Sequence, residues 1–141
     1  MQRKRIFLDA NVLFTAAHNP GGKAALLVEL GQKGHWDLYT STYAIEEAAR
    51  NLEIKYPECK AGLVQIIRYL TPVRHNPEHS YPGGLDPKDR PIFQAAVECS
   101  ATHLLTGDIK DFGHYMNQAK KTFNVCIQTT ADFYKDLSRE K

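Results

Sequence analysis

The 141-residue sequence has few cysteines and no long hydrophobic run, and each absence excludes a class of protein. Cys59, Cys99 and Cys126 lie far apart and form no C-x-x-C pair, so we expect reduced thiols rather than a disulfide framework or a zinc site. No stretch approaches the ~20 consecutive apolar residues of a transmembrane helix. Asp9 and Asn11 interrupt the first apolar run, which argues against a signal peptide, and we expect a cytoplasmic protein.

The sequence also lacks an excess of charge of either sign, with a formal net charge of +2. This balance neither requires nor excludes a nucleic-acid partner, so the local clustering of charge must decide. Hydrophobic residues make up 43% of the chain and charged residues 24%, which is typical of a globular fold. Because there is no repeat, low-complexity tract or linker, we predict a single domain over residues 1–141.

Short apolar segments alternate with longer segments of helical periodicity. This alternation predicts a parallel α/β sheet, whose working site lies at the carboxyl ends of the strands. We predict strands at 6–8, 37–40, 71–73, 103–106 and 125–127, and helices at 11–17, 23–33, 42–56, after Pro57, from Asp86 and up to Leu137. The stretch 74–84 is rich in proline and glycine and is predicted to be a loop.

Acidic residues fall where this fold would place a site. Asp9 and Asp108 directly follow predicted strands, and Asp89 lies in the first turn of a predicted helix. Glu46 and Glu47 lie in the helix after the second strand, and only one of them can face the same rim because adjacent helical residues point about 100° apart. We therefore expect about four carboxylates at one edge of the sheet.

Each acid has an ordinary alternative explanation. Asp9 and Asp86 are suitable helix caps, Asp89 is favourable near a helix N-terminus, and Asp108 suits a turn. Their joint placement is the stronger observation. Clustered carboxylates repel one another unless a hard cation such as Mg²⁺ or Mn²⁺ binds them. We predict metal ligands at Asp9, Asp89 and Asp108.

Four segments of the chain, in order, resemble the motifs of PIN-domain nucleases. Phe7–Leu13 is similar to the apolar-Asp-x-Asn-apolar opening motif, and Ser41–Leu52 to a motif with serine followed by glutamate. The spacing favours Glu47 over Glu46 as that glutamate. Asp86–Ile92 resembles the third motif, with Asp89 as its acid, and Leu105–Phe112 resembles the Thr-x-Asp-x-x-Asp-Phe motif, with Asp108 and Asp111 as its acids.

The resemblance implies a three-layer α/β/α sandwich with a central, mainly parallel sheet. It also implies Mg²⁺- or Mn²⁺-dependent hydrolysis of single-stranded RNA, with Asp9, Glu47, Asp89 and Asp108 as catalytic residues. Many small members of this family are VapC-type toxins that are blocked by an antitoxin protein, and many are homodimers. An antitoxin partner and a homodimer are therefore expectations here.

Around this acidic set we expect supporting polar and basic side chains. Asn11 and Thr106 suit either a ligand role or a supporting role by hydrogen bonds, and Asp111 is expected just outside the ligands. RNA must approach an acidic pocket, so positive charge should surround it. The candidates for substrate binding are Arg50, Lys88, Arg90 and Lys110, and Lys23 also lies close to the motifs.

Two other classes of function remain open. A haloacid-dehalogenase phosphatase would need D-x-D after the first strand, but Asn11 occupies the second position. The sequence shows no clear match to a receiver domain. The main alternative is a PIN-like module that binds RNA or protein without cleavage. Metal-dependent cleavage of RNA distinguishes the nuclease from the binding module, because the module binds without cutting.

Overall fold

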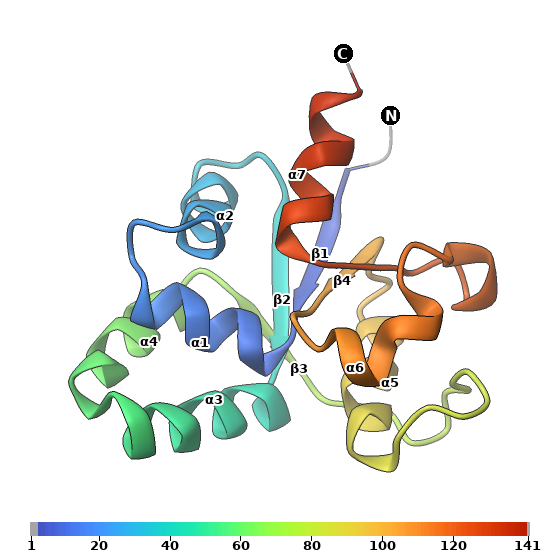
Figure 1. Ribbon diagram of the computed structural model, residues 1–141, viewed down its shortest axis with the longest axis horizontal. Helices are drawn as coiled ribbons and strands as arrows, with labels where there is room; N and C mark the ends of the chain where they lie inside the picture. The colour runs from blue at the N-terminus through green and yellow to red at the C-terminus, as the bar shows by residue number, and fades with distance from the viewer. Residues whose placement is uncertain (1–2, 141) are drawn as a thin grey trace.

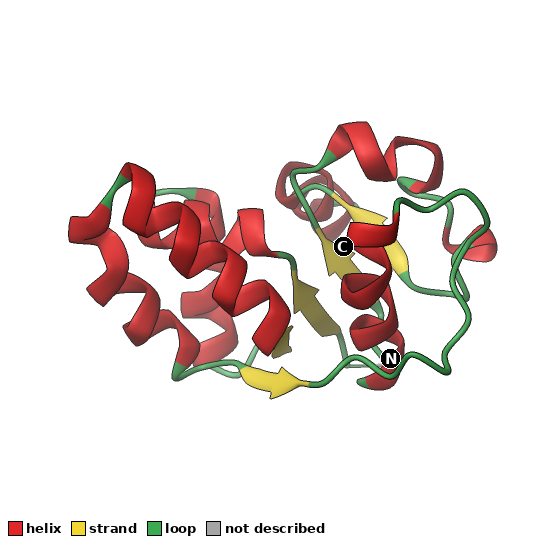
Figure 2. Ribbon diagram, turned by 90° about the horizontal axis from the view of Figure 1, so that it is seen from below, coloured by secondary structure: helices red, strands yellow, loops and turns green. Residues whose placement is uncertain are grey.

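The computed structural model describes residues 3–140 and has a sheet with helices on both sides (Figure 1). Seen from below in Figure 2, the helices form two groups with the strands between them. This is the three-layer α/β/α sandwich that was predicted. No helix within residues 3–140 combines the length and the hydropathy needed to cross a membrane.

All five strands of the sheet are parallel, in the order β3-β2-β1-β4-β5. The chain builds the sheet outward from β1 to β3 and then returns to place β4 on the other side of β1. The change of direction therefore lies between β1 and β4, where parallel sheets usually form their sites. The strands are β1 (Arg5–Leu8), β2 (Asp37–Ser41), β3 (Thr71–Val73), β4 (His103–Leu105) and β5 (Cys126–Gln128).

The helices lie close to the predicted segments. The α-helices are α1 (Ala10–His18), α2 (Lys23–Gln32), α3 (Thr42–Lys55), α4 (Lys60–Ile67), α5 (Arg90–Glu98), α6 (Ile109–Phe112) and α7 (Thr130–Ser138). Short 3₁₀ turns are η1 (Pro57–Cys59), η2 (Pro87–Asp89), η3 (Gly113–Tyr115) and η4 (Ala119–Lys121). Side chains cap the helices as their residue types predict: Ser41 accepts from the Ala44 amide and Thr129 from the Asp132 amide.

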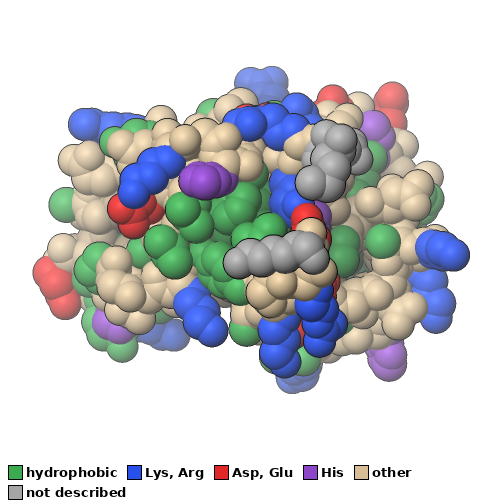
Figure 3. Space-filling model, turned by 90° about the horizontal axis from the view of Figure 1, so that it is seen from above, with side chains coloured by type: hydrophobic (Ala, Val, Ile, Leu, Met, Phe, Trp, Pro, Cys, Tyr) green, Lys and Arg blue, Asp and Glu red, His purple; other side chains and the backbone are tan. Residues whose placement is uncertain are grey.

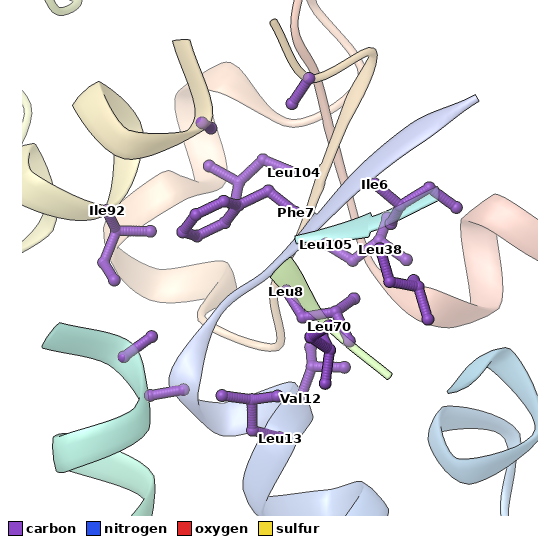
Figure 4. Packing of buried hydrophobic residues seen from close by; sticks show 14 of the residues in the cluster. Ile6, Phe7, Leu8, Val12, Leu13, Leu38, Leu70, Ile92, Leu104 and Leu105 are labelled. Carbon is purple, nitrogen blue, oxygen red and sulfur yellow. The ribbon is translucent and has the colours of Figure 1, made fainter. Parts of the chain in front are cut away.

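The central strands are buried on both faces, which is why they read as continuous apolar runs. Phe7 and Leu104 lie on the side of Ile92, whereas Leu8 lies with the side chains of α1 (Figure 4). Each fully buried side chain of this size stabilises the fold by about 1.5–3 kcal/mol. The core therefore holds the strand ends, and the polar residues that follow them, in fixed positions.

The region from 109 to 121 forms α6, η3 and η4, none of which the sequence pattern predicts. These elements are single turns of three or four residues, too short for helical periodicity to show. Asn117, Phe123 and Asn124 have positive φ, so the chain reverses repeatedly here. The predicted loop at 74–84 holds no helix or strand, and the Tyr115 hydroxyl donates to the Gly83 carbonyl within it.

Candidate active site

Asp9 directly follows β1 and is only 5% exposed. Its Oδ1 accepts from the Ala10 amide at 2.7 Å, and its Oδ2 accepts from the Thr106 hydroxyl at 2.8 Å. The Asn11 amide nitrogen lies 3.4 Å from the same Oδ2. Both oxygens of the buried carboxylate therefore have donors, and the side chain is held in one orientation.

Asn11 and Thr106 connect the ends of β1 and β4. The Thr106 hydroxyl also accepts from the Asp108 amide at 3.0 Å, and Asn11 Oδ1 accepts from the Gly107 amide at 2.6 Å. A Cβ at Gly107 would lie 3.4 Å from Asn11 Oδ1, so this close approach suits glycine. The sequence placed Asn11 and Thr106 beside the acids, and the structure places them there.

Asp89 lies where η2 meets α5 and is 6% exposed. Asp86 caps this turn by accepting from the Lys88 amide at 3.0 Å, and Pro87 fits the first position. Asp89 Oδ2 is buried and has no hydrogen-bond partner among residues 3–140. A buried, unpartnered carboxylate oxygen is costly, so this atom is a candidate for binding a cation.

Asp108 and Asp111 belong to the turn that begins α6. Asp108 Oδ1 accepts from the Asp111 amide at 3.0 Å, which fixes the turn. Asp89, Asp108 and Asp111 each offer a carboxylate oxygen, and these oxygens lie within 4.8 Å of one another. Asp9 is not part of this three-carboxylate group, but it interacts electrostatically with both Asp89 and Asp108.

Burial and mutual repulsion change the protonation of these acids. Burial raises the pKa of Asp9 to about 6, although its hydrogen bonds from Thr106 and Ala10 oppose the rise. Burial, followed by repulsion from Asp108 and Asp111, raises the pKa of Asp89 to about 7. The Lys88 ammonium has the opposite effect and lowers the pKa of Asp111. Without a cation, the site therefore resists carrying its full negative charge near neutral pH.

This donor set fits a hard divalent cation. Mg²⁺ and Mn²⁺ prefer carboxylate oxygens, and Asp89, Asp108 and Asp111 converge at ligand distance. Asp89 Oδ2 is buried and accepts no hydrogen bond from any residue in 3–140, so a cation would supply the partner it lacks. No sulfur or imidazole ligand belongs to the group, which disfavours zinc.

The two glutamates of α3 differ in their relation to the site. Glu47 is half-buried and its charge contributes to the raised pKa of Asp9, whereas Glu46 is exposed and makes no such contribution. The structure thus favours Glu47, as the spacing did. Ser41 caps the N-terminus of α3, the helix that carries Glu47, by accepting from the Ala44 amide.

The four basic residues expected to bind substrate have different surroundings. Lys88 Nζ lies 2.7 Å from Asp111 Oδ2 and therefore contacts the acidic group itself. The Arg90 guanidinium donates to the Leu85 carbonyl and stacks 4.7 Å from the centre of the Tyr81 ring. Arg50 and Lys110 are exposed, and neither forms an ion pair with another residue in 3–140.

Two features of the site were not expected from the sequence. Asp111 was expected behind the other acids, yet its carboxylate stands in the same group as those of Asp89 and Asp108. The Tyr43 hydroxyl donates to the Lys88 carbonyl at 3.2 Å and links α3 to the turn before Asp89. Residue spacing gives no signal for the second contact, because 45 positions separate its partners.

The acids gather at one end of the molecule. Figure 3 shows the opposite end, from which β1 starts, and its acidic side chains are scattered around a central hydrophobic area. The carboxyl ends of the strands face the other way (Figure 1). The acidic group is therefore a local feature of the site and not a property of the whole surface.

Comparison with known proteins identifies the family. A family profile described as the PIN domain matches residues 5–110, which is most of the chain. The chain belongs to the PIN domain family. The matched PIN segment includes Asp9, Glu47, Asp89 and Asp108, and it ends just before Asp111.

A solved structure supports the same fold. The chain resembles one in the crystal structure of VapBC2 from Rickettsia felis bound to a DNA fragment from their promoter, with 17% identity and a TM-score of 0.64. The match covers 89% of this chain and 98% of that chain. At this identity it establishes a shared PIN fold. No curated protein sequence matches the chain.

Proposed function

We propose that the protein is a divalent-metal-dependent endoribonuclease that hydrolyses phosphodiester bonds of single-stranded RNA. The observation that carries the proposal is the three-carboxylate group of Asp89, Asp108 and Asp111, together with the buried Asp89 oxygen that lacks a donor. Membership of the PIN domain family, many of whose members are nucleases, supports the same activity.

The proposed cofactor is Mg²⁺ or Mn²⁺. Asp89, Asp108 and Asp111 would hold it, with Asp9 next to them and Glu47 at the edge of the site. When bound, the metal supplies positive charge to the reacting phosphate and makes water a stronger nucleophile. Its charge would also offset the burial and the repulsion from Asp108 and Asp111 that raise the pKa of Asp89.

The other side chains prepare the site before substrate arrives. Thr106 and Ala10 hold the Asp9 carboxylate in place and favour its charged form. Lys88 does the same for Asp111 and adds positive charge beside the acids. Arg50 and Lys110 remain available for RNA phosphates, whereas Arg90 is held against Leu85 and Tyr81.

A metal titration tests this function. A 12-nucleotide single-stranded RNA with a fluorophore and a quencher is incubated with the protein in EDTA and in increasing Mn²⁺ or Mg²⁺. We expect cleavage only with metal, and none above background for Asp9→Asn. If RNA binds but is not cleaved at any metal concentration, the chain is a PIN-like binding module and the nuclease proposal is wrong.

We further propose that the nuclease acts as the toxin of a toxin–antitoxin pair in the cytoplasm. The likeness to a chain of VapBC2 supports this role and also an antitoxin partner. Induced expression should arrest bacterial growth for the wild type and not for Asp9→Asn. We also propose that residues 1–141 act as one domain within a homodimer, which light scattering would measure. Normal growth on expression of active wild-type protein would exclude the toxin role.

A further inference from the structure

A cavity of about 550 Å³ lies beside the acidic site, between α1, the start of α2, the turn after β4 and the start of α7. Its volume is within the range of roughly 300–1,000 Å³ typical of ligand pockets. The lining residues are Asn11, Val12, Thr15, Lys23, Ala24, Thr106, Gly107, Thr129 and Thr130. The function proposed above assigns no role to this space.

The cavity and the acidic site share one wall. Asn11 and Thr106 line the cavity, and the same two side chains hold Asp9 Oδ2. Gly107 completes this wall by donating its amide to Asn11 Oδ1. The cavity and the acidic site are therefore neighbours, separated by the layer that Asn11, Thr106 and Gly107 form.

The lining suits a sugar–phosphate chain. Lys23 is exposed and lines the cavity, and it forms no ion pair with another residue in 3–140. Threonine hydroxyls from α1 and from the start of α7 add hydrogen-bonding groups, and Val12 and Ala24 add an apolar surface. Among residues 3–140, no carboxylate lines the cavity, in contrast to the adjoining site.

A hydrogen bond from α7 holds the start of α2 in place beside the cavity. The Tyr134 hydroxyl on α7 donates to the Lys23 carbonyl at 3.0 Å. Burial raises the pKa of Tyr134 to about 12, so the hydroxyl keeps its proton near neutral pH. This contact joins the two helices that border the cavity and holds the backbone of Lys23 in position.

A second cavity makes a useful contrast. It has a volume of about 290 Å³ between α1, α2 and α4 and is lined largely by apolar side chains such as Ala16, Val28 and Ile66. Within the described part of the chain, no lysine or arginine lines this second cavity, and Glu29 adds negative charge. A polyanion that leaves the acidic site therefore finds a cation in the larger cavity and none in the smaller.

We propose that the larger cavity binds the sugar–phosphate backbone of the RNA next to the cleaved bond, with Lys23 contacting a phosphate. This inference deepens the proposed function and rests on it for the identity of the substrate. Lys23 is then a positioning residue that determines affinity, while the acids determine the rate of the chemical step. Such a contact is independent of base sequence, because phosphates carry no sequence information.

Binding and kinetics of Lys23→Met test the inference. Fluorescence anisotropy with a labelled 12-nucleotide RNA compares Asp9→Asn with the double variant Asp9→Asn/Lys23→Met, so that cleavage does not interfere. We expect at least about 10-fold weaker binding, typical of one lost charged hydrogen bond, and a salt dependence of log Kd that is smaller by about 0.7. In the active protein, Lys23→Met should raise KM and leave kcat unchanged.

Lys33→Met is the matched control, because Lys33 lies at the other end of α2 and pairs with Glu29. It should bind RNA like its parent. Equal losses in both variants, or none for Lys23→Met, would overturn the inference, as would a fall in kcat alone. If the protein binds RNA through Lys23 but never cleaves it, the cavity assignment stands and the nuclease proposal fails.

Discussion

The end of β1 and the start of α5 each bury an aspartate, but the two carboxylates have different surroundings. Asp9 accepts hydrogen bonds on both oxygens, from Ala10 and Thr106. Asp89 is equally buried, yet its Oδ2 has no partner among residues 3–140. Accordingly, burial raises the pKa of Asp9 to about 6 and that of Asp89 further, to about 7.

The difference indicates two kinds of role in one site. The protein itself supplies the donors that orient Asp9, so this carboxylate is ready before any cation binds. Asp89 Oδ2 lacks such a donor, and Asp89 lies beside Asp108 and Asp111. A bound cation would therefore stabilise the charged form of Asp89 more than that of Asp9. Asp9 is thus oriented by the protein alone, whereas Asp89 needs a bound metal to supply the partner of its buried oxygen.

The largest expected effect is the loss of cleavage when either aspartate loses its charge. Asp9→Asn and Asp89→Asn should each reduce kcat at least about 100-fold, comparable to the loss of one electrostatic stabilising group in other enzymes. The assay is cleavage of labelled RNA at saturating Mn²⁺, with folding checked by circular dichroism. A folded variant with wild-type activity would remove that residue from the mechanism.

Metal binding should separate the two aspartates. At 100 times its Kd, Mn²⁺ should raise the free energy of unfolding of the wild type by about 2.7 kcal/mol. For a chain of this length that corresponds to an increase in Tm of about 10 °C. Asp89→Asn should lose most of this increase, whereas Asp9→Asn should keep part of it because the three-carboxylate group remains intact.

Asp86→Asn is the control for this measurement, because Asp86 is exposed and caps the same turn without belonging to the group. It should retain the full increase in Tm. The comparison between the two aspartates fails if Asp9→Asn abolishes the stabilisation by Mn²⁺ while Asp89→Asn preserves it.

The stability of the metal-free protein should fall as pH rises. Both pKa values are raised above the ordinary value of 3.8, so the folded state binds more protons than the unfolded state between about pH 4 and 7. From pH 5.5 to 7.5 the free energy of unfolding should decrease by about 3 kcal/mol from these two groups. The lowered pKa of Asp111 acts only below this window.

Urea denaturation in EDTA measures this pH dependence. Asp89→Asn should flatten the slope more than Asp9→Asn, because the pKa of Asp89 lies higher. Both variants should be more stable than the wild type at pH 7.5 and similar to it near pH 4. A wild-type stability that rises from pH 5.5 to 7.5 would contradict the raised pKa values.

The placement of the acids could be predicted because it follows from topology. Asp9 and Asp108 directly follow strands, and β1 pairs with β4 in parallel, so both residues reach the same edge. The strands themselves are recognisable because burial on both faces leaves continuous apolar runs such as Ile6–Leu8. Helix caps such as Ser41 and Thr129 are equally local signals.

The contacts across the site could not be predicted in this way. Lys88 bonds to Asp111 rather than standing free for substrate, because the turn before α5 packs against the turn that begins α6. That packing depends on single turns between 109 and 121, whose periodicity is too short to read. The cavity beside Lys23 likewise could not be predicted, because it depends on how α2 and α7 pack together. Some of its lining residues are more than 100 positions apart in the sequence.

The smallest effect we predict concerns the donor that distinguishes Asp9 from Asp89. Thr106→Val keeps the shape of a side chain that is 0% exposed but removes its hydroxyl, which donates to Asp9 and accepts from the Asp108 amide. We expect about a 10-fold loss of kcat, typical of a group that orients a metal ligand. The pKa of Asp9 should rise further, because the Thr106 hydrogen bond lowers it.

Two variants make this test specific. Thr106→Ser retains the hydroxyl and should keep near-wild-type activity. Thr40→Val removes another buried hydroxyl, which donates to the Leu8 carbonyl and touches no carboxylate, so it should reduce stability without changing kcat. If Thr40→Val and Thr106→Val reduce kcat equally, the loss reflects general disturbance of the strand ends, and orientation of Asp9 by its donors is not what distinguishes it from Asp89.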